Sequence, residues 1–187
     1  MALLNIARLG RPVLVRKADP LDLAALASPD VQRLIDDMVE TMHDAPGVGL
    51  AAPQVHRSLR LFVMDPGKAR EGEEGSGLRV VVNPVLTFPD DERIAVWEGC
   101  LSIPGIRGRT ERFASVDVEY LDRDGRPQRA HFHGLPAIVV QHETDHLDGI
   151  LFPSRMPDLS LLAFEDELDR REPGDERGED ESDDDEE

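Results

Sequence analysis

The residues from Gln141 to His146 read QHETDH and contain the pattern His-Glu-x-x-His. A helix is predicted here, and residues four apart on a helix lie on one face, so His142 and His146 can reach the same metal ion. Glu143 lies beside that face and can accept a proton from a water activated at the metal. The face is otherwise apolar, so burying these side chains without a metal or another partner would be costly. The pattern therefore favours a metal site over a purely structural helix.

A catalytic metal usually has three protein ligands and one open position. No histidine follows His146, so Glu165 and Glu167 are the downstream candidates for the third ligand, and Cys100 is the upstream candidate. A thiolate suits a borderline-soft metal, and two histidines with a thiolate would accept zinc or iron(II). A ligand from Glu165 or Glu167 would instead indicate a metallopeptidase.

A glycine-rich segment, GVGLAAPQ, runs from Gly47 to Gln54. Glycine permits close backbone approaches that a β-carbon would block. The segment lacks the Lys-Ser/Thr ending of a phosphate-binding loop, and no strand is predicted before it, so we exclude that interpretation. A helix-to-strand turn packed with small alanines and a segment that lines a cleft both stay open.

Three segments resemble, in order and at plausible spacing, the signature motifs of the peptide deformylase family. They are Gly47–Gln54, Glu98–Ser102 (EGCLS) and Gln141–His146. The resemblance covers most of the chain and excludes the acidic C-terminal tail. It implies a metal-dependent hydrolase that removes the N-formyl group from the N-terminal methionine of newly made polypeptides and releases formate.

The resemblance also implies roles for individual residues. The metal ligands would be Cys100, His142 and His146, and Glu143 would act as general base and then as general acid. The Gln54 side-chain amide and the Leu101 backbone N–H would stabilise the oxyanion. Iron(II) would be the native metal, with zinc, nickel or cobalt as possible substitutes. The implied substrate-binding residues are Gly47, Val48, Gly49, Glu98, Gly99, Arg107, Leu135 and Ile138.

Some of these positions have equally simple alternatives. Core packing would explain Leu135 and Ile138, and Arg107 could be an ordinary surface charge. The chain also departs from the family pattern, because His56 stands where the family more often has glycine and Ser154 replaces a common aspartate. Both departures concern local loop geometry.

The predicted fold class is α+β, with small mixed or antiparallel strands packed around a central metal-binding helix and with N- and C-terminal helices. Ser28, Pro29 and Asp30 predict the start of a first helix, which Pro46-Gly47 ends. The metal-binding helix is predicted from about Pro136 to before Gly149, and a third helix from Leu159 to Arg171. Short β-rich runs predict strands between them. These runs are Leu61–Met64, Leu78–Val82, Ile94–Trp97, Ser115–Tyr120 and Gln128–Phe132.

Composition limits the organisation and the partners. The chain has 187 residues and a net charge of −18, of which residues 172–187 carry −10 through eleven acids and one base. We therefore predict a catalytic domain at 1–172 and an acidic, disordered tail at 173–187. The acidic balance argues against a specific nucleic-acid partner, and no apolar run is long enough to cross a membrane. The absence of a long apolar run favours a cytoplasmic protein. The resemblance to deformylases implies that it acts on N-formylmethionyl nascent peptides, transiently near the ribosome.

Two further function classes deserve comparison with a deformylase. A non-catalytic binding module could use the same fold, but Gln54, Cys100, Glu143 and both ligand histidines are all present. A structural metal site would favour four closed protein ligands, and the sequence supplies three candidates.

Overall fold

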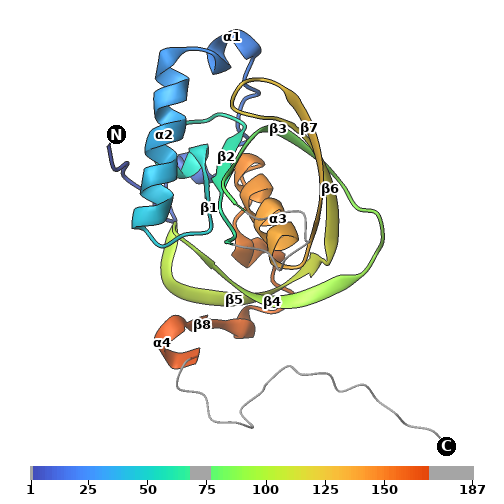
Figure 1. Cartoon of the computed structure of the whole chain (residues 1–187). Coiled ribbons are helices and arrows are strands. Elements are labelled where there is room, and N and C mark those ends of the chain that lie inside the picture. The colour runs from blue at the N-terminus through green and yellow to red at the C-terminus, as the bar shows by residue number, and fades with distance from the viewer. Residues whose placement is uncertain (1, 68–76, 169–187) are drawn as a thin grey trace, which may run out of the picture.

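A computed structural model describes residues 2–67 and 77–168 of the chain (Figure 1). The predicted acidic tail at 173–187 lies outside these residues. The division into a domain at 1–172 and a tail stays a prediction. Within the described residues, no helix combines the length and the apolar character that crossing a membrane requires.

The first predicted helix is confirmed as α2, Pro29–Asp44. Ser28 is its N-cap, since the Ser28 hydroxyl accepts a hydrogen bond from the Val31 N–H at 3.3 Å. The apolar side chains at helical spacing are buried on one face, as predicted. They are Val31, Leu34, Ile35, Met38 and Met42.

The strands form two antiparallel sheets (Figure 1). The larger sheet has the order β1-β2-β3-β6-β7 and the smaller one β4-β5-β8. The strands of the larger sheet are β1 Gly49–Ala51, β2 Leu61–Met64, β3 Arg79–Thr87, β6 Ser115–Leu121 and β7 Pro127–His133. Those of the smaller sheet are β4 Arg93–Cys100, β5 Ile103–Phe113 and β8 Leu162–Phe164.

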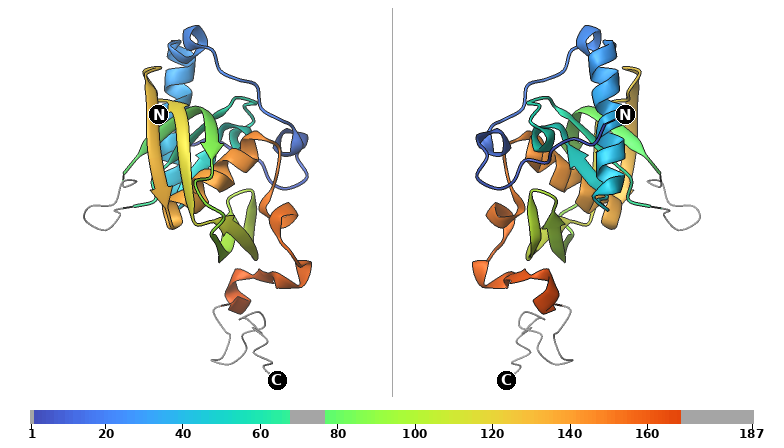
Figure 2. Two further views of the ribbon diagram at one scale, coloured as in Figure 1. Left: turned by 90° about the vertical axis from the view of Figure 1, so that its right-hand side faces the viewer. Right: turned by 90° about the vertical axis from the view of Figure 1, so that its left-hand side faces the viewer.

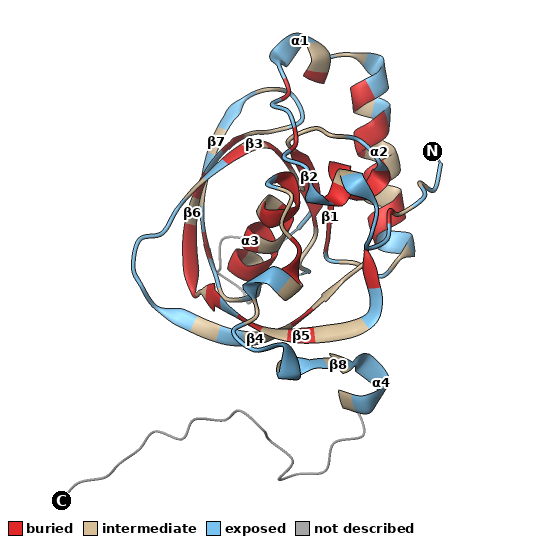
Figure 3. Ribbon diagram, turned by 180° about the vertical axis from the view of Figure 1, so that it is seen from behind, coloured by how far each residue is buried: buried red, intermediate tan, exposed pale blue. Residues whose placement is uncertain are grey.

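The helix predicted to bind the metal is α3, Leu135–Leu147, and it lies in the middle of the molecule between the two sheets (Figure 1). Its residues are mostly buried (Figure 3), and Val139, Val140 and Leu147 belong to the same apolar cluster as Phe62 and Phe132. Burying an aromatic side chain of this size contributes about 1.5–3 kcal/mol. The predicted α+β architecture around a central helix is confirmed.

Short turns and an extended N-terminal segment complete the fold. The turns are η1 Pro12–Val15, α1 Leu23–Leu26, η2 Ala52–Val55 and η3 Phe152–Arg155. The N-terminal segment runs along the outside of the molecule (Figure 2) and meets the end of α3, where the Ala18 N–H donates to the Leu147 carbonyl at 2.8 Å. Gly149 has φ +74° there, and a β-carbon would lie 2.8 Å from the backbone of Val15. This close approach requires glycine.

The prediction of a third helix at Leu159–Arg171 was wrong for the residues described. Leu159–Leu161 form a 3₁₀ turn (η4), Leu162–Phe164 form β8, and only Glu165–Leu168 are helical (α4). Leu159 and Phe164 are exposed, so a helix here would have no apolar face to bury. Pairing with the open edge of β5 satisfies the backbone instead.

Candidate metal centre and active site

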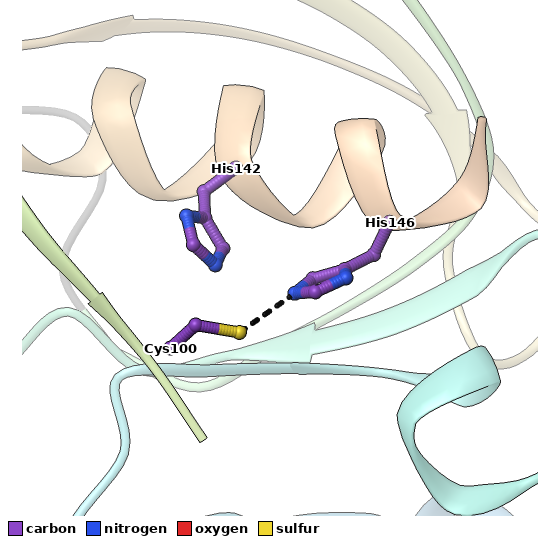
Figure 4. A group of neighbouring side chains, drawn as sticks. All are labelled: Cys100, His142 and His146. Atoms are coloured by element: carbon purple, nitrogen blue, oxygen red, sulfur yellow. Dashed lines mark hydrogen bonds between the residues drawn. The ribbon is translucent and has the colours of Figure 1, made fainter. Parts of the chain in front are cut away.

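The two histidines of the His-Glu-x-x-His pattern point from α3 toward Cys100 at the end of β4 (Figure 4). The Cys100 Sγ lies 3.2 Å from the His146 Nε2. One ligand atom from each of Cys100, His142 and His146 lies within 4.8 Å of the other two. Within residues 2–67 and 77–168, this is the group of three or more such side chains that could hold a metal.

The donor set and its spacing fit a metal ion. Metal–sulfur and metal–nitrogen bonds of about 2.0–2.3 Å place neighbouring tetrahedral ligand atoms roughly 3.3–3.8 Å apart, which is compatible with this cluster. His146 is 1% exposed, and its Nδ1 has no hydrogen-bond partner among the described residues. Burial and the neighbouring His142 lower the pKa of His146 well below its ordinary value. His146 is therefore neutral, which is the form that binds a metal.

Glu98 orients His142. The His142 Nδ1 lies 2.6 Å from the Glu98 Oε2, so the His142 Nε2 is the nitrogen left to face Cys100. Burial alone would raise the pKa of Glu98, but hydrogen bonds from His142 and Arg112 outweigh it and lower the pKa to about 2. The carboxylate is therefore ionised and can stabilise the imidazole in one orientation.

Arg112 connects Glu98 to a second carboxylate on α3. The Arg112 Nε donates to the Glu98 Oε1 at 2.6 Å, and its second guanidinium nitrogen donates to the Asp145 Oδ2 at 2.6 Å. Thr110 also donates to Glu98, and Arg155 donates to Asp145 at 2.6 Å. The Arg112 side chain is 4% exposed, so this network fixes β4 and β5 against α3 beneath the metal ligands.

Glu143 lies directly against the glycine-rich segment. A β-carbon on Gly49 would lie 2.3 Å from the Glu143 Oε1, so only glycine leaves room for this carboxylate. Glu143 is buried, and its Oε2 has no hydrogen-bond partner among the described residues. Burial raises the pKa of Glu143 from 4.5 to about 7, despite the opposing effect of His142. A carboxyl group of this kind can take up and release a proton near neutral pH.

The Gln54 side chain is held in one orientation. Its Oε1 accepts a hydrogen bond from the Ala51 N–H at 2.8 Å, and a backbone N–H can only donate. The amide nitrogen must therefore face the opposite way, where it lies 3.2 Å from the Ser102 Oγ and 3.6 Å from the Cys100 Sγ. Gln54 is 1% exposed, so a hydrogen-bond donor is positioned beside the metal ligands.

A pocket of about 540 Å³ opens beside this cluster. Its size is within the range of small-ligand sites, about 300–1,000 Å³. Gln54, Cys100, Leu101, His142 and Glu143 contribute to its wall. So do all the residues expected from the sequence to bind substrate: Gly47, Val48, Gly49, Glu98, Gly99, Arg107, Leu135 and Ile138.

Comparison with known proteins decides the family. The polypeptide deformylase family model matches residues 3–161. The chain belongs to the polypeptide deformylase family. It is 40% identical to peptide deformylase 2 of Pseudomonas syringae pv. tomato over 87% of this chain and 92% of that protein. It is 47% identical to the peptide deformylase of Rhizobium meliloti over 75% of this chain and 78% of that protein.

Solved deformylase structures share the fold. The Met-Ala-Ser-bound class I type b peptide deformylase of Acinetobacter baumannii has a TM-score of 0.76 and 37% identity to this chain. The match covers 83% of this chain and 99% of that one. The family is metal-dependent and hydrolyses N-formyl peptides, which agrees with the Cys100, His142 and His146 cluster.

The structure separates the three candidates for the third ligand. Cys100 meets both histidines, whereas Glu165 forms an ion pair with Arg107. Glu165 and Glu167 are absent from the metal-ligand group found among the described residues. The metallopeptidase alternative, which needed a carboxylate from the C-terminal segment, loses its structural basis.

Sequence reasoning missed several residues of this deformylase site. Arg112, Ile103 and Ile106 lie on β5, a strand whose Pro104, Gly105 and Gly108 hide its β pattern. Arg112 could have been expected only from the need of two buried carboxylates, Glu98 and Asp145, for a cation.

The two departures from the family pattern lie outside the pocket lining. His56, where deformylases more often have glycine, adopts the left-handed conformation with φ +63°. That conformation costs a residue with a β-carbon roughly 1–2 kcal/mol. Ser154 lies in the η3 turn.

Proposed function

We propose that this chain deformylates N-formylmethionyl nascent peptides with the site built around Cys100, His142 and His146. The observation that carries the proposal is the convergence of these three ligand atoms beside a buried Glu143 carboxylate. Deformylation is the reaction of the family, and the roles of individual residues in this chain are part of the proposal.

Cys100, His142 and His146 would hold one divalent metal. When bound, such a metal polarises a carbonyl oxygen and makes water more acidic. Glu98 keeps His142 turned toward the site through the hydrogen bond at Nδ1, and Arg112 keeps Glu98 ionised. Removing such an orienting partner typically costs about 10–100-fold in metal affinity or activity.

Glu143 would transfer the protons of the reaction. Its Oε1 lies against Gly49, and its Oε2 has no hydrogen-bond partner in the described part of the chain, so the carboxylate can accept the proton of the attacking water. The pKa of about 7 suits it to return that proton to the departing amine. Formate and a free α-amino group result.

Gln54 and Leu101 would stabilise the oxyanion that develops on the formyl group. The Gln54 amide nitrogen is directed toward Cys100 by the Ala51 N–H on its other side. The Leu101 backbone N–H follows Cys100 directly in the chain and completes the pair of donors. Preorganised donors of this kind contribute about 2.7–4 kcal/mol each in other hydrolases.

The pocket would receive the methionine side chain and the peptide backbone. Ile138 and Leu135 lie one and two turns before His142 on α3 and give one wall an apolar surface. Gly47, Val48 and Gly49 form another wall, and Gly99 and Arg107 lie on paired strands beside it. Glu98 would contribute mainly by orienting His142, since its carboxylate contacts His142 and Arg112.

We further propose iron(II) as the native metal, in a cytoplasmic enzyme that works transiently near the ribosome. Zinc, nickel and cobalt are alternatives that suit the same sulfur and nitrogen donors. An accessible iron–thiolate site should lose activity in air, so aerobic and anaerobic purification should give different activities. Equal activity after both would argue against iron.

Variant proteins test the assignments. Each is purified anaerobically and loaded with nickel, and its metal content and formate release from formyl-Met-Ala-Ser are measured. Glu143→Ala should keep one metal per chain and lose nearly all turnover, whereas Cys100→Ala should lose metal as well. A Cys100→Ala protein that binds metal normally would refute the ligand set.

A further inference from the structure

The C-terminal segment supplies a charged side chain to the wall of the active-site pocket. The family match ends at residue 161. Beyond it, β8 continues the smaller sheet, with Ala163 paired with Arg107 and Phe164 paired with Ile106. Glu165 follows directly and lines the pocket. Among the described residues that line this pocket, Glu165 is therefore the one that lies beyond the part of the chain matched by the family.

Glu165 is paired with Arg107 at this wall. The Arg107 Nε donates to the Glu165 Oε1 at 3.0 Å, and one terminal nitrogen of the same guanidinium donates to the same oxygen. The two side chains are 38% and 49% exposed, so solvent and a bound peptide can both reach them. The carboxylate offsets the charge of Arg107 and can itself accept a hydrogen bond from a cationic group.

Glycine at position 99 brings the pair close to the reacting centre. Gly99 lies opposite Arg107 in the β4–β5 ladder, and a β-carbon on Gly99 would lie 2.8 Å from an Arg107 guanidinium nitrogen. The guanidinium therefore packs over the residue that precedes the metal ligand Cys100. An extended peptide advances about 3.3–3.6 Å per residue, so the first residues after the formylmethionine can reach this pair.

We propose that Glu165 and Arg107 form a charge filter that selects the residues following the formylmethionine. The inference rests on the proposed function and adds a substrate class to it. Peptides with a basic residue at the second or third position bind better because Glu165 attracts them. Peptides with an acidic residue there bind worse, because Glu165 both repels them and occupies the cation that would pair with them.

The test compares formyl-Met-Ala-Xaa and formyl-Met-Xaa-Ser peptides in which Xaa is Lys, Gln or Glu. The quantity measured is the Lys-to-Glu ratio of kcat/KM within each nickel-loaded variant, so differences in active fraction cancel. An exposed charge pair contributes about 0.2–1 kcal/mol. Glu165→Gln removes the favourable pair between Glu165 and a peptide lysine, and it frees Arg107 to pair with a peptide glutamate. The ratio should therefore fall by about 2- to 25-fold in Glu165→Gln.

Two further variants separate local from general electrostatics. Arg107→Gln should raise the Lys-to-Glu ratio, because the carboxylate is then no longer offset. Glu167→Gln removes the same charge from α4 at a residue that does not line the pocket, and it should keep the wild-type ratio within about twofold. If Glu167→Gln changes the ratio as much as Glu165→Gln, or if neither changes it, the filter is refuted.

A binding measurement keeps this test independent of turnover. Trp97 is the single tryptophan of the chain and lines the pocket, so its fluorescence can report binding of the product peptides Met-Ala-Lys and Met-Ala-Glu. Wild-type protein should bind Met-Ala-Lys more tightly, and Glu165→Gln should reduce this preference. Preferential binding without any formate release would contradict the proposed function and support the filter. Formate release without charge preference would do the reverse.

Discussion

Replacing Gly49 with alanine should disable the general base without removing the metal. The new β-carbon would lie 2.3 Å from the Glu143 Oε1, whereas ordinary contact begins at 3.4 Å. The carboxylate must therefore move by about 1 Å, and a misplacement of that size can cost about 100-fold in rate. This corresponds to about 2.7 kcal/mol in the activation free energy.

The fold should survive this change, because the clashing atoms are at the end of a side chain. Formate release from formyl-Met-Ala-Ser, metal content and thermal unfolding are measured on the same preparation. Gly47→Ala is the matched comparison, since its β-carbon would lie closest to the Leu101 Cδ1, at 2.9 Å, and no nearer than 3.4 Å to its other described neighbours. We expect its kcat to fall by less than about tenfold. A Gly49→Ala enzyme with kcat within about threefold of wild type would refute the assignment of Glu143.

Three other perturbations test the surrounding structure. Arg112→Met leaves the buried Glu98 without its cation and Asp145 with Arg155 alone, so it should cost about 3–5 kcal/mol of unfolding free energy in urea. Arg155→Met, at a side chain 45% exposed, should cost less than about 1 kcal/mol. Equal costs would contradict the network. Glu98→Gln should weaken metal binding by about 10–100-fold in competition with a chelator, and unchanged affinity would show that His142 needs no orienting carboxylate. His56→Gly should stabilise the fold by about 0.5 kcal/mol in thermal unfolding. Relief of the strain in the left-handed conformation slightly exceeds the conformational entropy that glycine adds to the unfolded chain. A loss of stability would contradict this.

The sequence predicted the catalytic helix and its ligands because their spacing follows from helix geometry. His142 and His146 are one turn apart, so any helix at 135–147 puts them on one face. Cys100 could be chosen over Glu165 only by resemblance to deformylases, because no local rule brings the end of β4 to α3. All the predicted site residues except His146 line one pocket, and their individual roles remain proposals.

Long-range contacts account for what the sequence did not reveal. β5 is the longest of the described strands, yet its proline and glycines give no clear alternation of apolar and polar residues, so the sequence did not indicate Arg112. The C-terminal segment was predicted as one helix from its local pattern, whereas the open edge of β5 converts Leu162–Phe164 into a strand. That tertiary pairing also brings Glu165 to the pocket, where no sequence periodicity would place it.

Product analysis by mass spectrometry tests the central claim most directly. Nickel-loaded protein is incubated with a formyl-Met-Ala-Ser peptide extended by several residues, with and without a chelator. We predict loss of the formyl group alone, with formate released in equal amount, every internal peptide bond intact, and no reaction with chelator or in Glu143→Ala. Cleavage of an internal peptide bond, or an unchanged peptide after incubation with folded and metal-loaded protein, would contradict the account.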